Sequence, residues 1–138
     1  MSWLWWSLLS ALFAAATAIL AKQGVAGINS NLATAIRTTV ILVVAWGIAA
    51  ATNPLSELTR IGGRTFLFLV LSGLATGLSW LCYFRALQLG EASRVAPIDK
   101  LSVVFVIVLA AVFLQEKLTI QSVAGAALIA AGAILLAF

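Results

Sequence analysis

Long apolar runs separated by short polar joints dominate the chain. Five stretches are each close to the length of a membrane-spanning helix, and they cover residues 3–21, 31–51, 65–84, 95–114 and 119–138. A bilayer core of about 30 Å needs about 20 apolar residues of helix. The joints hold helix-breaking residues, among them Gly27 in the first, Asn53-Pro54 in the second and Gly90 in the third. The pattern therefore predicts five transmembrane helices.

The apolar runs are continuous, whereas the strands of a membrane barrel alternate apolar and polar residues. We therefore expect an all-α membrane protein, a bundle of five transmembrane helices that forms one domain over residues 1–138.

The fourth run is interrupted by Asp99 and Lys100. Proline is favoured in the first turn of a helix, and an acid is stabilised near the positive N-terminal end. We therefore expect this helix to begin at Pro97 and run to Leu114, with Asp99 in its first turn near one membrane interface.

Composition agrees with a lipid environment. Of 138 residues, 64% are hydrophobic and 9% are charged, whereas a soluble domain is about 25% charged. The 8 basic and 4 acidic residues are scattered, so no basic patch indicates nucleic-acid binding. Without histidine and with one cysteine, a metal site is not expected. We expect no catalytic residues, no cofactor and no enzymatic activity, and no glycine-rich loop indicates ATP binding.

The basic residues barely favour one orientation in the membrane. Lys22, Arg85 and Arg94 belong to the joints on one side, and the opposite joints hold another three, Arg60, Arg64 and Lys117. Since positive residues in short loops set orientation, this balance leaves two alternatives open: one fixed orientation, or insertion in both.

Two stretches resemble the drug/metabolite transporter superfamily in its EamA-type branch. One is Ala86–Ile98, which contains Leu89-Gly90-Glu91, and the other is Phe113–Thr119, where Gln115 replaces the glycine usual in that branch. The last run, with its small residues from Gly125 to Gly132, is similar to the final helix of that branch's repeat.

The resemblance implies half of a larger transporter. Most members of this branch have ten helices in two inverted five-helix repeats, and such repeats place the substrate site near the bilayer midplane. A five-helix chain then needs a second copy, so the resemblance implies an antiparallel, dual-topology homodimer with a small-molecule substrate. The expected location is the cytoplasmic (inner) membrane.

Two charged residues within the runs are candidates for the substrate pocket. Asp99 is the one acid inside a predicted span, where it either carries a proton or substrate group or only stabilises a helix end. The glutamate that four-helix relatives carry in their first helix has no counterpart in residues 3–21. Arg37 either extends toward the membrane interface or binds an anion inside the dimer.

The third run has a polar stripe. Ser72, Thr76, Ser79 and Tyr83 recur at helical spacing, with Trp80 beside them. We expect this face to line a pocket, the alternative being hydrogen bonds between helices. The candidate pocket residues are thus Arg37, Ser72, Thr76, Trp80, Tyr83 and Asp99. Glycines spaced for close helix approach give candidate dimer or helix contacts at Gly73, Gly77, Gly125 and Gly132.

These features together favour a secondary transporter that moves a small metabolite or amphiphile by alternating access. Two alternatives remain open, namely a subunit of a lipid-carrier flippase with a different partner chain, and a membrane scaffold or assembly protein that transports nothing.

Overall fold

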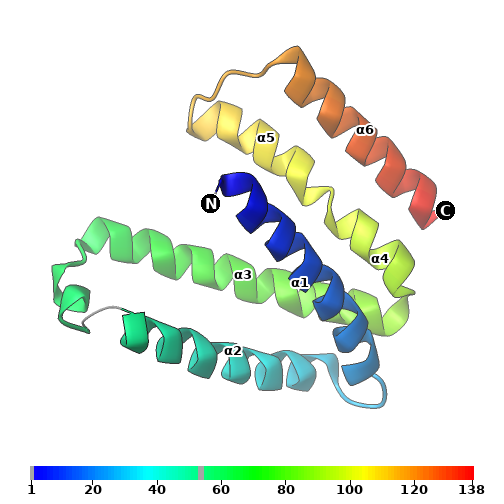
Figure 1. Cartoon of the computed structure of the whole chain (residues 1–138). Helices are drawn as coiled ribbons and strands as arrows, with labels where there is room; N and C mark the ends of the chain where they lie inside the picture. Colours follow the sequence, from blue (N-terminus) through cyan, green and yellow to red (C-terminus); the bar gives the residue numbers. More distant parts are fainter. Residues whose placement is uncertain (1, 53–54) are drawn as a thin grey trace. The chain divides into compact units, whose positions relative to one another are not determined.

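The computed structural model describes residues 2–52 and 55–138, with side chains throughout except at positions 55, 57 and 59. Its helices are α1 (Trp3–Gly24), α2 (Ser30–Thr52), the 3₁₀ helix η1 (Leu55–Arg60), α3 (Gly63–Leu89), α4 (Ala92–Asp99), α5 (Ser102–Phe113) and α6 (Ile120–Ala137) (Figure 1). The described ranges contain no strand, so the all-α prediction is confirmed. The predicted break at Asn53-Pro54 lies outside the described residues.

Five helical segments are long and apolar enough to cross a membrane. They are α1, α2, α3, α4 together with α5, and α6, with 22, 23, 27, 22 and 18 residues. At about 1.5 Å per residue the shortest is about 27 Å long, close to the thickness of a bilayer core. The chain is therefore a multi-pass membrane protein, as its hydrophobic pattern predicts.

The third span ends later than predicted. We expected it to stop at Phe84 and to be followed by a polar joint, but α3 continues to Leu89. Alanine, leucine, glutamine and arginine favour helix, and Leu87 in this extension is fully buried, with 0% of its surface exposed. The helix stops only before Gly90, so the joint between α3 and α4 is just two residues long.

The fourth span begins earlier than predicted and is interrupted. Pro97 does not start the helix but lies inside α4, and Asp99 is the last residue of α4 rather than part of a first turn. Around the interruption, the Lys100 N–H donates to the Pro97 carbonyl and the Leu101 N–H to the Ile98 carbonyl, each at 3.0 Å. These are tighter i+3 bonds. They mark the interruption between α4 and α5, which lies after Pro97, whereas a proline disturbs the turn before it.

The chain forms two compact units, and one of them comprises Met1–Lys22 with Leu89–Phe138. In this unit α6 packs along both α4 and α5 (Figure 1). Ala126 and Ala133 are the buried residues of α6 and lie seven apart, hence on one face. At the start of α6, the Thr119 hydroxyl accepts a hydrogen bond of 3.0 Å from the Ser122 N–H and caps the helix.

The other unit comprises Gln23–Gln88 and contains α2 and α3, which run antiparallel (Figure 1). Its buried residues gather near one end of these helices, with Ser30, Ala33 and Thr34 on α2 and Phe84 and Leu87 on α3. The Thr34 hydroxyl donates to the Ser30 carbonyl at 2.9 Å, so this buried polar group is satisfied within its own helix.

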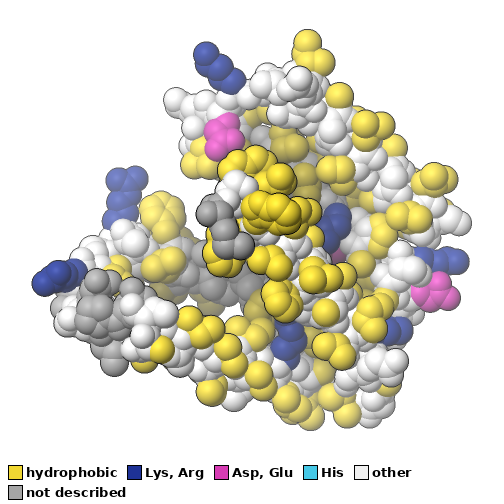
Figure 2. Space-filling view, in the orientation of Figure 1, with side chains coloured by type: hydrophobic (Ala, Val, Ile, Leu, Met, Phe, Trp, Pro, Cys, Tyr) yellow, Lys and Arg dark blue, Asp and Glu magenta, His cyan; other side chains and the backbone are white. Residues whose placement is uncertain are grey.

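Most large apolar side chains are exposed on the chain surface. Hydrophobic atoms are spread across the face shown in Figure 2, and lysine and arginine side chains are few and scattered there. Among the side chains that the structure describes, only Leu87 and Val25 are large residues with less than 2% of their surface exposed. A water-soluble domain of this size could not tolerate such exposure, so lipid is the solvent for these side chains.

The loop after α5 explains why glycine is usual at position 115 in the transporters that the chain resembles. Gln115 has a backbone φ of 55°, the one positive φ at a non-glycine residue in the described ranges. The following N–H, that of Glu116, donates to the Ala110 carbonyl at 3.2 Å and closes the end of α5. A side chain in this left-handed conformation costs about 1–2 kcal/mol, which glycine does not incur.

We therefore expect Gln115→Gly to stabilise the protein. The gain should be about 0.5–1 kcal/mol, because relief of strain exceeds the extra freedom glycine adds to the unfolded chain. Thermal unfolding in detergent measures it, with Gln115→Ala as the control, since alanine removes the amide but keeps the Cβ atom. A Gln115→Gly protein that unfolds at the same temperature as Gln115→Ala would contradict the strain.

Candidate functional site

Arg37 lies inside a membrane span and rests against an aromatic pair. It is seven residues after the start of α2, and its guanidinium carbon is 4.3 Å from the centroid of the Trp80 ring and 5.3 Å from that of Phe84. Trp80 and Phe84 are four residues apart, so both rings belong to the same face of α3. Arg37 is half-buried, and Phe84 has 3% of its surface exposed.

The aromatic pair explains how an arginine is tolerated at this depth. An arginine near the middle of a span costs about 2.5–3.5 kcal/mol on insertion scales. A desolvated cation–π contact contributes about 2 kcal/mol or more, so the rings offset most of this cost. Neither α2 nor α3 contains an aspartate or glutamate that could neutralise the charge. The positive charge of Arg37 is therefore held by aromatic rings rather than by a carboxylate.

The structure groups three of the six candidate pocket residues. Trp80 and Tyr83 are half-buried residues less than one turn apart on α3, and the Trp80 ring contacts the Arg37 guanidinium. Ser72 and Thr76 lie further toward the start of α3 and are exposed, and the Thr76 hydroxyl donates to the Ser72 carbonyl at 2.9 Å. The polar stripe is thus present as a helical face, and Arg37 meets it at the Trp80–Tyr83 end.

Asp99, the sixth candidate, belongs to the other unit and sits at the break between α4 and α5. Its carboxylate is 3.2 Å from the Lys100 ammonium group. The half-buried acid is thus adjacent to its own counter-ion. No cluster of three or more metal-binding side chains is found among the residues that the structure describes.

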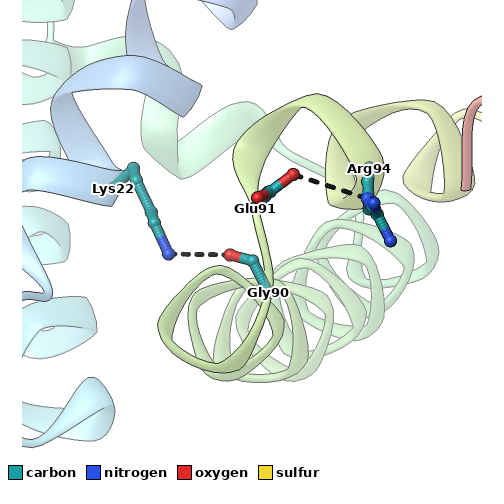
Figure 3. Close-up of polar contacts among 4 residues, drawn as sticks. All are labelled: Lys22, Gly90, Glu91 and Arg94. Atoms are coloured by element: carbon teal, nitrogen blue, oxygen red, sulfur yellow. Dashed lines mark hydrogen bonds and ion pairs between the residues drawn. The ribbon is translucent and has the colours of Figure 1, made fainter.

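Lys22 at the end of α1 reaches the joint between α3 and α4. Its ammonium group donates to the Gly90 carbonyl at 2.7 Å, and beside it the Glu91 carboxylate and Arg94 guanidinium form an ion pair at 3.4 Å (Figure 3). Because α3 ends at Leu89, no later N–H group of that helix donates to the Gly90 carbonyl. The lysine therefore satisfies a backbone carbonyl at the end of the helix.

A second link joins the end of α3 to the loop before α2. The Gln88 side-chain amide donates to the Ile28 carbonyl at 2.7 Å and in turn accepts a bond of 2.7 Å from Arg85. This relay belongs to the same unit as Arg37 and fixes the end of α3 on which Trp80 and Phe84 are carried.

The four candidate packing glycines are open toward the rest of the chain. A Cβ atom added at Gly73, Gly77, Gly125 or Gly132 would meet no heavy atom within 4 Å outside its own helix. Within each unit these glycines therefore have open space around them, and their role in helix or dimer contacts stays a prediction.

Two important residues did not stand out in the sequence. Phe84 lies one helical turn after Trp80, and the spacing of these two aromatic residues was the signal available for it. Gln88 gave no such signal, because only the fold brings its amide to a loop 60 residues away in sequence.

An open hollow of about 350 Å³ lies along the start of α6. Its lining is almost wholly apolar and consists of Leu118, Thr119, Ile120, Val123, Ala124 and Ala127. Lipid chains or an apolar surface suit such a lining better than a polar solute, so the Arg37 group is the stronger candidate for solute binding.

Comparison with known proteins supports a transporter. The model of the EamA-like transporter family matches residues 1–138. A protein of a Sinorhizobium species, described as an "uncharacterized transporter in cobO 3'region", is 61% identical over 136 residues, which cover 99% of this chain and 96% of that protein. No solved structure matches. The full-length match and the high identity together show that this chain belongs to the EamA-like transporter family.

Proposed function

We propose that the protein is a secondary transporter that moves a small metabolite or amphiphile across the cytoplasmic membrane by alternating access. The observation that carries the proposal is the charged Arg37 side chain, which lies against the Trp80 and Phe84 rings inside a membrane span. The chain that holds it belongs to a family of transporters. Charged side chains are rare inside membrane spans and typically mark substrate or ion pathways. The polar face of α3 that leads from this group, with Thr76 and Ser72, supplies further hydrogen-bonding groups along the span.

We further propose that the working unit is an antiparallel homodimer. Five spans place the two termini on opposite sides of the membrane. Near the ends of the spans, three basic residues belong to each side, Lys22, Arg85 and Arg94 against Arg60, Arg64 and Lys117. Because loop charge then favours neither orientation, copies of both orientations can meet and form the inverted pair on which alternating access relies.

Asp99 is the proposed proton-carrying group. It is the acid at the break between α4 and α5, and an interrupted helix frees backbone groups that can bind an ion or solute. Its carboxylate lies 3.2 Å from the Lys100 ammonium group, a contact that a proton or a substrate group would replace.

Dual topology predicts that both chain ends are found on both sides of the membrane. Single-cysteine tags placed before residue 1 and after residue 138, in a Cys82→Ser background, should each react with a membrane-impermeant maleimide from both faces of intact vesicles. Labelling of each tag from one face only would show a fixed orientation and would contradict the antiparallel homodimer.

Proton coupling predicts that Asp99→Asn abolishes transport. Asparagine keeps the shape but cannot ionise, so counterflow of radiolabelled amino acids, carboxylates and phosphate esters in proteoliposomes should fall to background, with unchanged protein abundance. Glu116→Gln in the loop before α6 is the matched control and should transport normally. Retained counterflow in Asp99→Asn would leave Asp99 with a structural role only. If the wild-type protein moves no solute of the panel, the transporter proposal itself fails.

A dimer contact through α6 predicts that Gly125→Leu combined with Gly132→Leu weakens dimerisation. The monomer should fold normally, because added atoms at these positions meet no neighbour in the chain. Native mass spectrometry measures the dimer, with Ala124→Leu plus Ala131→Leu on the other side of α6 as the control. A dimer that survives the glycine changes but is lost in the alanine control would move the contact to the face that bounds the apolar hollow.

A further inference from the structure

The stacking of Arg37 leaves the edge of its guanidinium for another partner. The two rings lie 4.3 and 5.3 Å from the guanidinium carbon, which are distances of contact through the flat faces of the π systems. All five N–H donors of a guanidinium lie in its plane and point outward at its edge. Contacts with rings therefore hold the charge in place but do not occupy the outward-pointing donors.

Within the unit Gln23–Gln88, the described contacts of the Arg37 side chain are those with the two rings. Neither α2 nor α3 contains an acid. The neighbouring hydroxyl of Thr38 donates to the Thr34 carbonyl at 2.7 Å within α2. N–H donors inside a membrane need acceptors, and no carboxylate of α2 or α3 is there to supply one.

We infer that the edge of the Arg37 guanidinium binds an oxyanion, a carboxylate or a phosphate group, of the transported molecule. This inference rests on the proposed transport function and names its substrate class. A guanidinium binds a carboxylate or phosphate through two parallel N–H···O bonds. Trp80 and Phe84 act as positioning residues, because they fix the plane of the guanidinium and hence the direction from which the oxyanion binds.

The position of Arg37 allows two sources for the oxyanion. At about 1.5 Å per residue, its backbone is about 10 Å along α2 from Ser30, which is within the reach of a long side chain from the headgroup region. The oxyanion is therefore either that of a soluble solute or the phosphate of an anionic lipid. Both use the same guanidinium edge, and binding measurements in different lipids separate them.

The test is equilibrium binding of radiolabelled inorganic phosphate and benzoate to the protein in phosphatidylcholine nanodiscs. We expect binding of at least one probe, weakened about tenfold or more by Arg37→Lys, because lysine cannot form the paired bonds or stack in the same way. Arg64→Lys is the matched control: Arg64 lies 5.9 Å from the Phe68 ring at the start of α3. The Arg64→Lys variant should bind the probe as tightly as the wild type does.

The positioning role of the rings has its own readout. Trp80→Leu should weaken binding of the same probe, whereas Trp46→Leu, which changes another tryptophan of the same unit, should not. Equal binding of the probe by Trp80→Leu and Trp46→Leu would contradict the positioning role of Trp80. Size-exclusion profiles of all variants should match that of the wild type, and Trp80→Phe, which keeps an aromatic face, should restore most of the binding if Trp80→Leu folds poorly.

Lipid as the source is measured in nanodiscs of phosphatidylcholine with phosphatidylglycerol at a ratio of three to one. Phosphatidylglycerol retained by the wild type in native mass spectra, lost in Arg37→Lys and competing with phosphate, supports the oxyanion site and identifies the lipid as its occupant. Equal binding of phosphate, benzoate and phosphatidylglycerol by wild type and Arg37→Lys overturns the site.

These outcomes are separable from the failure of transport. If Arg37→Lys exchanges the solute panel as well as the wild type and binds the probes equally, the oxyanion site fails while the transporter proposal stands. If the wild type moves no solute yet loses probe binding in Arg37→Lys, the oxyanion site stands and the transport proposal fails.

Discussion

The hydrocarbon interior of a membrane offers no hydrogen-bond partners, and this constraint governs the polar groups of the membrane spans. Backbone N–H and carbonyl groups are satisfied by helices, and the hydroxyls of Thr34, Thr38 and Thr76 donate to carbonyls of their own helices. A charge has no such local solution. Arg37 lies on aromatic rings and Asp99 beside Lys100, so each charge within a span is held by a named neighbour. The candidate site is built on the aromatic contacts of Arg37.

Backbone carbonyls at the ends of the spans need hydrogen-bond donors, and side chains distant in sequence supply them. Lys22 donates to the Gly90 carbonyl, and Gln88 donates to the Ile28 carbonyl. Both contacts satisfy carbonyls where no helix continues. They hold the joint after α3 and the loop before α2 in place. Most large apolar side chains of the described helices are exposed, and a Cβ atom added at either glycine of α6 would meet no neighbour within its own unit.

Two boundary predictions failed for different physical reasons. Hydropathy ended the third span at Phe84 because Arg85 and Gln88 are polar, yet both side chains point their polar groups to each other and α3 continues. The fourth span was expected to start at Pro97, because proline suits a first turn. Instead Glu91 precedes the first residue of α4, and Pro97 lies inside that helix. A hydropathy pattern reports the average polarity of a segment, whereas the end of a helix depends on the hydrogen-bond partners of individual residues.

The sequence by itself determined the solvent, the helical class and the number of spans, because these depend on composition and on run length, which any fold of the chain must respect. It also singled out Arg37 as a costly charge in an apolar run. Only the tertiary structure decided what that charge does. Trp80 and Phe84 are more than 40 positions away, and no periodicity within α2 or α3 alone relates them to Arg37. The antiparallel arrangement of the two helices brings the rings against the guanidinium, which is the contact on which the proposed oxyanion site rests.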